Sequence, residues 1–133
     1  MANVEYPQFK INGNSVSGNT LLGFKAGKNI TTGTENVAIG SIALEDNNSG
    51  SGNVAIGREA LANNIGADNN VAIGKLAMYT NQSGNENTAV GTEALRLNTS
   101  GSNNAIFGTC LVKLCVIVSI EKILFYYKKS YIK

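Results

Sequence analysis

The chain contains no histidine and no tryptophan, and only one proline, Pro7, among its 133 residues. Without histidine, neither a Ser-His nor a Cys-His nucleophilic pair can form, and a zinc site with imidazole ligands is excluded. Aromatic residues make up only 7% of the chain, whereas a layered globular core normally buries many large side chains. In their place stand 15 glycines and numerous asparagines. This composition favours a thin, elongated fold.

The chain also lacks a strong charge of one sign. Its net charge is +2, and a nucleic-acid partner is therefore not expected. Six basic and eight acidic residues give residues 1–109 a charge of −2, whereas residues 110–133 carry +4. Both cysteines, Cys110 and Cys115, lie in the second region, at a spacing that matches no common metal or redox motif. We predict no metal and no other cofactor, and expect two small buried or free thiols.

No pair of acidic residues recurs at a spacing that suits general acid–base catalysis. The acidic residues considered are Glu45, Asp46, Glu59, Asp68, Glu86 and Glu93. We interpret them as solvated surface charge, and residues 46–50 lack the later glutamate of a calcium loop. Formal glycosylation sequons begin at Asn29, Asn47, Asn81 and Asn98, as chance alone produces in an asparagine-rich chain. The sequence predicts a protein that is not an enzyme, without catalytic, cofactor or metal residues.

A single repeated unit accounts for most of the sequence. Asparagine recurs at a constant interval, without insertion, at positions 19, 36, 53, 70, 87 and 104, and glycine follows four residues later in every copy. Between them lies an apolar triplet, which is Val-Ala-Ile in three copies. The triplet suits a short strand that is buried on both faces. The glycine suits a sharp corner with positive φ.

The repeat predicts an all-β fold, a parallel β-roll or β-solenoid of about five to six coils. Seventeen residues have a contour of roughly 56 Å, enough for one flattened turn with two short strands, and coils would stack about 4.8 Å apart. The stacked asparagines would form a hydrogen-bonded ladder; alternatively, they only form turns. Residues 47–50, residues 98–101 and their counterparts in the other copies are interpreted as turns. Residues 59–62 and 93–96 are interpreted as too short for more than a helical turn.

Alternation along the predicted strands places valine and isoleucine on one face and alanine on the other. We expect the larger side chains to fill the interior of each coil and the flat alanine face to point outward. One roll of this width has little apolar bulk of its own, so the alanine face is expected to support side-by-side association. The sequence thus predicts a homo-oligomer.

Residues 36–40, 53–57, 70–74 and 87–91 share the pattern Asn-x-Ala-x-Gly, and an alanine follows each after two further residues. These strings resemble the head repeats of the YadA-like trimeric autotransporter adhesins, and similar strings occur in tail-fibre and virion-surface proteins. The resemblance covers about residues 19–112. It implies a left-handed β-roll, a homotrimer, and attachment to a host surface or extracellular-matrix protein. It transfers no ligand-binding residue, because the shared positions are structural.

The expected function is a non-enzymatic adhesion module at the cell surface, outside the cell or on a virion. The alternative is a structural segment of a phage or large-virus fibre without a ligand of its own. An ice-binding face is not expected, because the threonines do not hold one offset in the repeat. The first ten residues do not resemble a signal peptide.

We divide the chain into an N-terminal cap (1–18), the β-roll (19–114) and a divergent hydrophobic and basic tail (115–133). The register predicts asparagine at 121 and glycine at 125, where the chain has Glu121 and Phe125. Three interpretations of the tail stay open. We favour a hydrophobic cap or trimer-contact strand. A membrane anchor would place charges near the bilayer centre at about 2.5–3.5 kcal/mol each. The tail also fits a shifted or truncated gene end.

Overall fold

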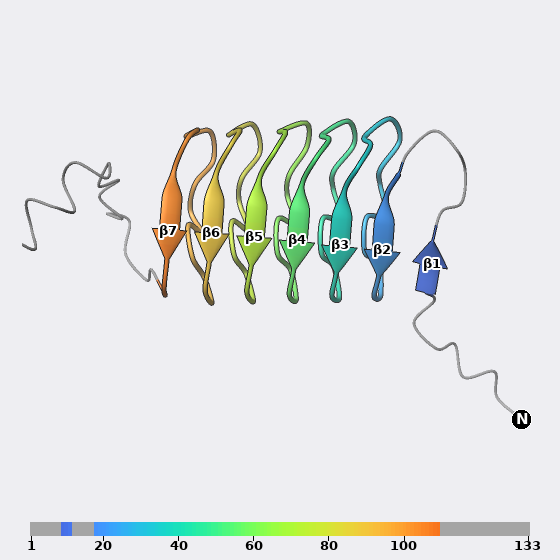
Figure 1. The fold of residues 1–133 in the computed structure, drawn as a ribbon, viewed down its shortest axis with the longest axis horizontal. Helices are drawn as coiled ribbons and strands as arrows, with labels where there is room; N and C mark the ends of the chain where they lie inside the picture. Colours follow the sequence, from blue (N-terminus) through green and yellow to red (C-terminus); the bar gives the residue numbers. More distant parts are fainter. Residues whose placement is uncertain (1–8, 12–17, 110–133) are drawn as a thin grey trace, which may run out of the picture.

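The computed structural model describes residues 9–11 and 18–109. In these ranges the chain has no helix and seven three-residue strands, which form one sheet in chain order (Figure 1). The strands are β1 (Phe9–Ile11), β2 (Thr20–Leu22), β3 (Val37–Ile39), β4 (Val54–Ile56), β5 (Val71–Ile73), β6 (Thr88–Val90) and β7 (Ala105–Phe107). Strands β2 to β7 are parallel and follow one another at the constant interval of the repeat, so the predicted β-solenoid is confirmed.

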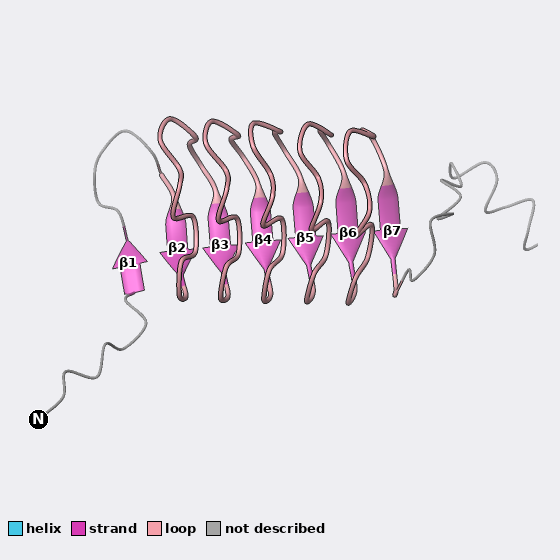
Figure 2. Cartoon of the chain, turned by 180° about the vertical axis from the view of Figure 1, so that it is seen from behind, coloured by secondary structure: helices cyan, strands magenta, loops and turns pink. Residues whose placement is uncertain are grey.

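Identical positions of successive coils lie directly beside one another. Val54 pairs with Val71 and Ile56 with Ile73, for example. The prediction of two strands per coil is wrong, because the return path of each coil consists of turns (Figure 2). The turns still stack through main-chain bonds, such as the one that the Leu61 N–H donates to Ala77 O at 3.0 Å. At the N-terminal end of the sheet, β1 pairs antiparallel with β2.

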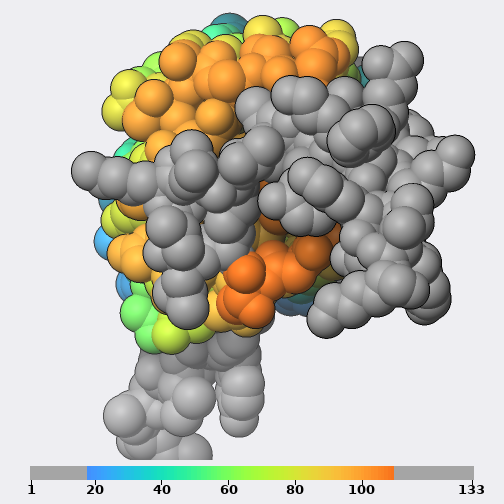
Figure 3. Space-filling model, turned by 90° about the vertical axis from the view of Figure 1, so that its left-hand side faces the viewer, coloured from blue at the N-terminus to red at the C-terminus, as the bar shows by residue number. Residues whose placement is uncertain are grey.

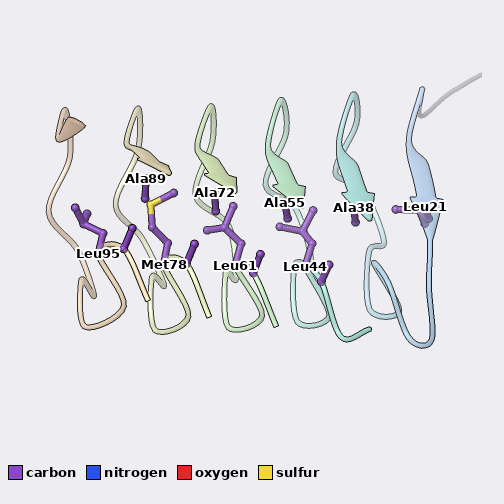
Figure 4. Packing of buried hydrophobic residues seen from close by; sticks show 13 residues of the cluster. Leu21, Ala38, Leu44, Ala55, Leu61, Ala72, Met78, Ala89 and Leu95 are labelled. Atoms are coloured by element: carbon purple, nitrogen blue, oxygen red, sulfur yellow. The ribbon is translucent and has the colours of Figure 1, made fainter. Parts of the chain in front are cut away.

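The strand alanines point into the roll, so the expected orientation of the strands is wrong. Ala38, Ala55, Ala72 and Ala89 are fully buried, while the residues on either side of each are half-buried or exposed. The interior is narrow. In each coil it is filled by a bulky side chain from the turn that lies opposite the strand, and we call these side chains the corner residues. These corner residues are Leu44, Leu61, Met78 and Leu95, which point toward the strands in Figure 4. In these four coils, therefore, only a methyl group fits on the strand side.

The corner residues adopt a backbone conformation that bulky side chains rarely take. Leu44, Leu61, Met78 and Leu95 have φ values of 54°, 50°, 48° and 52°. This left-handed conformation costs roughly 1–2 kcal/mol per residue, which burial of the side chain offsets by about 1.5–3 kcal/mol. Residues 59–62 therefore do not form a helical turn, since Glu59 and Leu61 both have positive φ.

The recurring asparagines form a ladder along the interior, as one of the two interpretations predicted. We call residues 19, 36, 53, 70, 87 and 104 the first asparagine ladder. The Oδ1 atom of each asparagine up to Asn87 accepts the main-chain N–H of the next one at 2.8–3.0 Å. From Asn53 onward, Nδ2 also donates to the Oδ1 of the preceding rung at 2.8–3.2 Å. These bonds satisfy amides that would be costly to bury singly.

A second asparagine ladder runs through residues 47, 64, 81 and 98, which were interpreted only as turn formers. Nδ2 of Asn64, Asn81 and Asn98 donates to Oδ1 of the preceding rung at 2.8–3.2 Å. The same nitrogen also donates to the main-chain carbonyl three residues later in each coil. The turn is therefore held from inside the roll.

Candidate interaction surface

An apolar stripe runs along the outside of the sheet. It consists of Val37, Ile39, Val54, Ile56, Val71, Ile73, Thr88 and Val90, and we call it the Val/Ile stripe. Alternation brings these side chains to one face, and the register stacks like on like. All are half-buried except Ile73, which is 37% exposed. A single roll thus leaves a row of β-branched side chains in partial contact with water.

The dimensions of the stripe limit how it can be covered. The four strands of the stripe, spaced about 4.8 Å apart, span roughly 14 Å, and side chains two residues apart on a strand are roughly 7 Å apart. Each partner in a standard interface contributes about 800 Å², which is several times the area of such a strip. A partner that covers the stripe must therefore also contact the loops beside it.

The loops beside the strands carry side chains that change from coil to coil. The residues that follow the corner glycines are Phe24, Ser41, Arg58, Lys75 and Thr92. Phe24 is 63% exposed, and Arg58 and Lys75 are also exposed. These residues change although the backbone path is the same in every coil. The buried asparagine and alanine positions, in contrast, hold the same residue in all of the central coils. The fold therefore specifies the interior and leaves these loop side chains open to other uses.

The acidic side chains are distributed along the roll and mostly bound within it. Ion pairs join Glu45 to Lys25 (3.4 Å), Glu59 to Arg58 (2.6 Å) and Glu93 to Arg96 (3.2 Å). Asp46 Oδ1 accepts the Asn29 side-chain amide at 2.9 Å, and Asp68 Oδ1 accepts the Ser51 N–H at 2.7 Å. Glu86 is exposed. These contacts tie one coil to the next or one residue to its neighbour.

Asp68 belongs to a column of short oxygen-bearing side chains that the sequence analysis missed. This acceptor column contains Thr34, Ser51, Asp68, Asn85 and Ser102. The N–H of each residue up to Asn85 donates to the side-chain oxygen of the next member at 2.7–3.1 Å. The signal that would have found the column is recurrence of Ser, Thr, Asp or Asn at one repeat position, regardless of which of them occurs.

Three of the four sequon asparagines belong to the second asparagine ladder. Asn47 and Asn81 are fully buried, and Asn98 is half-buried with its amide bonded to Asn81 and Gly101. Only Asn29 is exposed. Residues 46–50 also differ from a cation-binding loop, because the side chain of Asn47 is buried in the ladder.

Among residues 9–11 and 18–109, no group of three or more His, Cys, Asp or Glu side chains is placed to hold a metal ion. No helix in the described part of the chain is long and apolar enough to cross a membrane. Cys110, Cys115 and the tail (115–133) lie outside the described residues, so their expected roles stay predictions.

No protein-family model, curated protein or solved structure matches the chain. The resemblance to YadA-like head repeats therefore depends on the repeat strings alone.

Proposed function

We propose that the chain is a non-enzymatic structural and adhesion module, in which three left-handed β-rolls associate side by side. Their loops face a host cell or an extracellular-matrix protein, at a cell or virion surface. The observation that carries this proposal is the Val/Ile stripe. The resemblance to YadA-like head repeats supplies the handedness and the number three.

The physical reason for association is the partial exposure of stacked apolar side chains. Val54, Ile56 and Val71 would lose their remaining contact with water if three stripes faced a common axis. This arrangement replaces the expected contact through the alanines, which are buried inside each roll. The variable loop side chains, such as Phe24, Arg58 and Lys75, stay at the periphery for ligand contact.

The oligomer is tested by light scattering on the full chain. We expect about 42 kDa, three times the 14.0 kDa of one chain. Lysines at two stripe positions (Val54→Lys with Val71→Lys) should give monomers, because the charges would be buried in the interface. The matched control places lysines at two exposed loop positions (Ser83→Lys with Ser100→Lys) and should keep the trimer. A monomeric wild-type chain would overturn the trimer.

Adhesion is tested separately, by binding of the trimer to surfaces coated with collagen or fibronectin and to cultured host cells. Saturable binding that weakens on Arg58→Ala and Lys75→Ala supports the adhesion role. Failure on all three surfaces favours the second candidate, a structural segment of a phage or large-virus fibre without a ligand. That candidate is supported by the extent to which polar side chains, including Asp68 and Glu93, are bonded within the roll.

A further inference from the structure

Exposed charges of opposite sign lie at the two ends of the parallel strands. Strands β2 to β7 point the same way (Figure 1), so the residues before them gather along one edge of the sheet and the residues after them along the other. Among the described residues two or three positions before a parallel strand, the exposed charged ones are all acidic, and we call them the acidic flank: Glu35, Asp68 and Glu86. Among those two or three positions after a strand, the exposed charged ones are all basic, and we call them the basic flank: Lys25, Arg58 and Lys75.

Most of these flank charges are not neutralised within one chain. Lys25 and Arg58 are paired with Glu45 and Glu59. Lys75 and the three residues of the acidic flank, in contrast, form no ion pair with any residue that the structure describes. One edge of the sheet therefore keeps a negative charge, and the other keeps an ammonium group without a counter-charge.

The charges of the two flanks occur in the same coils. Counted from Asn19, the first, third and fourth coils each have one base on the basic flank and one acid on the acidic flank. The second and fifth coils have Ser41 and Thr92 in place of the base, and neither has an acid two or three positions before the next strand. Within one chain the base and the acid of a coil lie at opposite ends of adjacent strands, roughly 20 Å apart for six residues at about 3.3 Å each. The match therefore points to contact between chains.

Rolls that face one another through the Val/Ile stripe and point the same way bring opposite flanks together. Around an axis parallel to the stack, the strands of successive chains follow one another head to tail, so the basic flank of each roll meets the acidic flank of the next. Seen along the stack from the β7 end, the described coils lie one behind another (Figure 3), so this rotation keeps equal coils at one level. Two rolls that faced each other with their stacks in opposite directions would instead place acid against acid.

We propose that the two flanks are the surfaces by which copies of this chain recognise one another. Each base binds the acid that ends the same coil of the neighbouring roll. The pairs join Lys25, Arg58 and Lys75, in this order, to Glu35, Asp68 and Glu86 of the partner subunit. This inference rests on the side-by-side association proposed above, and adds to it the direction and the axial register of the rolls.

The register follows from the spacing of the charges. A coil climbs by one strand spacing, about 4.8 Å, between its beginning and its end, and the long side chains of lysine and arginine bridge an offset of this size. A relative shift of one coil would open the ring into a helical filament. In one direction it would keep only the contact of Arg58 with Glu86 of the partner subunit, and in the other only that of Lys75 with Asp68 of the partner subunit. Three pairs form only when equal coils meet.

These pairs would lie at the rim of the stripe contact and contribute more to specificity than to affinity. An exposed ion pair adds little free energy, whereas like charges placed opposite each other are strongly unfavourable. Removal of one charge, as in Lys75→Ala or Arg58→Ala, should therefore leave the assembly intact. Reversal of a charge should disrupt it.

Charge reversal and its repair test the proposal in the full chain, by sedimentation equilibrium over a dilution series. Lys75→Glu and Glu86→Lys should each raise the concentration of half-dissociation at least about tenfold, because like charges then meet at every contact between chains. The variant with both changes should return to within about threefold of the wild-type value, since opposite charges meet again. The control is Lys28→Glu, which makes the same change of net charge at an exposed lysine away from both flanks and should have no effect.

Weakening by both single reversals, with recovery in the double variant, supports the proposal. Absence of weakening or of recovery would overturn it and leave association through the stripe standing, as would an equal effect of Lys28→Glu. A monomeric wild-type chain would overturn both. A wild-type dimer that weakens and recovers in this way supports the flank contacts and overturns only the number three.

Carbodiimide crosslinking provides a second measurement, because it joins amines directly to carboxylates that touch them. In assemblies formed from mixed nitrogen-15-labelled and unlabelled chains, mass spectrometry should find Lys75 joined to Glu86 of the partner subunit, in peptides with one labelled and one unlabelled half. Crosslinks confined to one chain would overturn the proposal. A predominant link of Lys75 to Asp68 of the partner subunit would overturn the register, because it corresponds to a shift of one coil.

Discussion

The first coil and the central coils fill the same cross-section with different side chains. In the second coil Ala38 on the strand faces inward and Leu44 reaches in from the corner, and both are fully buried. In the first coil Leu21 occupies the strand position and Gly27 the corner position. A Cβ on Gly27 would lie 2.6 Å from Leu21 Cδ2. Strand and corner therefore share one volume, which a single large side chain fills from either side.

The polar part of the interior differs between the same coils. Ile30 stands in the first coil where the following coils have Asn47, Asn64 and Asn81, and it packs against the hydrophobic core. The first coil thus keeps a rung of the first asparagine ladder, Asn19, but has an apolar side chain in place of the second ladder, while the central coils contain rungs of both ladders. The difference teaches that apolar positions need only a constant total volume, whereas a ladder position needs a particular partner in the neighbouring coil.

The largest effect should come from a requirement that both regions share. A Cβ would meet the next coil at Gly23 in the first coil, 2.5 Å from Gly40 O, and at Gly57 in a central coil. Gly23→Val and Gly57→Val should each cost at least about 4 kcal/mol of unfolding free energy, since the clash is with backbone. Urea denaturation provides the measurement. Gly66→Val is the control, because the only close neighbour of its Cβ is the Ser49 hydroxyl; an equal loss there would contradict the stacking explanation.

Replacing a second-ladder asparagine of a central coil with isoleucine, the residue found there in the first coil, should also lower the free energy of unfolding. Asn64→Ile deprives Ala67 O and Asn47 Oδ1 of a donor and Asn81 Nδ2 of an acceptor. We expect a loss of about 2–4 kcal/mol, since buried polar groups are left unsatisfied. Calorimetry or urea denaturation measures it. Asn48→Ala, at an exposed residue of the same turn, should change stability by less than about 0.5 kcal/mol; similar losses in both variants would remove the distinction.

A double-mutant cycle tests the shared volume of the first coil. Leu21→Ala alone opens a cavity, and Gly27→Leu alone overpacks, so each should cost about 2–3 kcal/mol. The double variant recreates the arrangement of Ala38 and Leu44, and Gly27 already has a φ of 58°. It should recover at least about half of the summed losses. Strictly additive losses would show that strand and corner do not share one volume.

The smallest expected effect is a gain. Glu86 has a φ of 57°, and the same repeat position holds Gly18, Glu35, Gly52, Asn69 and Asn103, which also have positive φ. Glu86→Gly should raise the unfolding free energy by about 1 kcal/mol, because glycine adopts this conformation without the Cβ penalty. Thermal unfolding should show no such gain for Glu86→Ala, which keeps the Cβ. A gain in both variants would point to the charge and not the backbone.

Much of the fold could be predicted because the repeat has no insertions. Equal spacing of Asn36, Asn53 and Asn70 requires stacked coils, and stacked buried amides require a ladder. The second ladder had the same signal at residues 47, 64, 81 and 98. Asparagine and serine before glycine also suit a turn, so local turn chemistry accounts for these residues without a ladder and conceals the meaning of their recurrence.

The orientation of the strands could not be predicted from alternation. Val-Ala-Ile is apolar on both faces, so a period of two defines two sides without saying which is inside. The deciding residues are Leu61, Met78 and their equivalents, which fill the interior from a corner with positive φ. Bulky residues rarely adopt that conformation, and nothing in the sequence marks them for it. The outer stripe was consequently assigned to the wrong side chains.

The strict register between coils has a consequence for how such a gene changes. Each coil contacts its neighbours through positions that recur at one constant interval, from Asn19 to Asn104. In-frame duplication or loss of one whole coil by recombination therefore leaves every contact type intact, whereas insertion of a single residue moves all later side chains to the wrong partners. Relatives of this chain are expected to differ in length by whole coils, and their reach to grow in steps of one strand spacing.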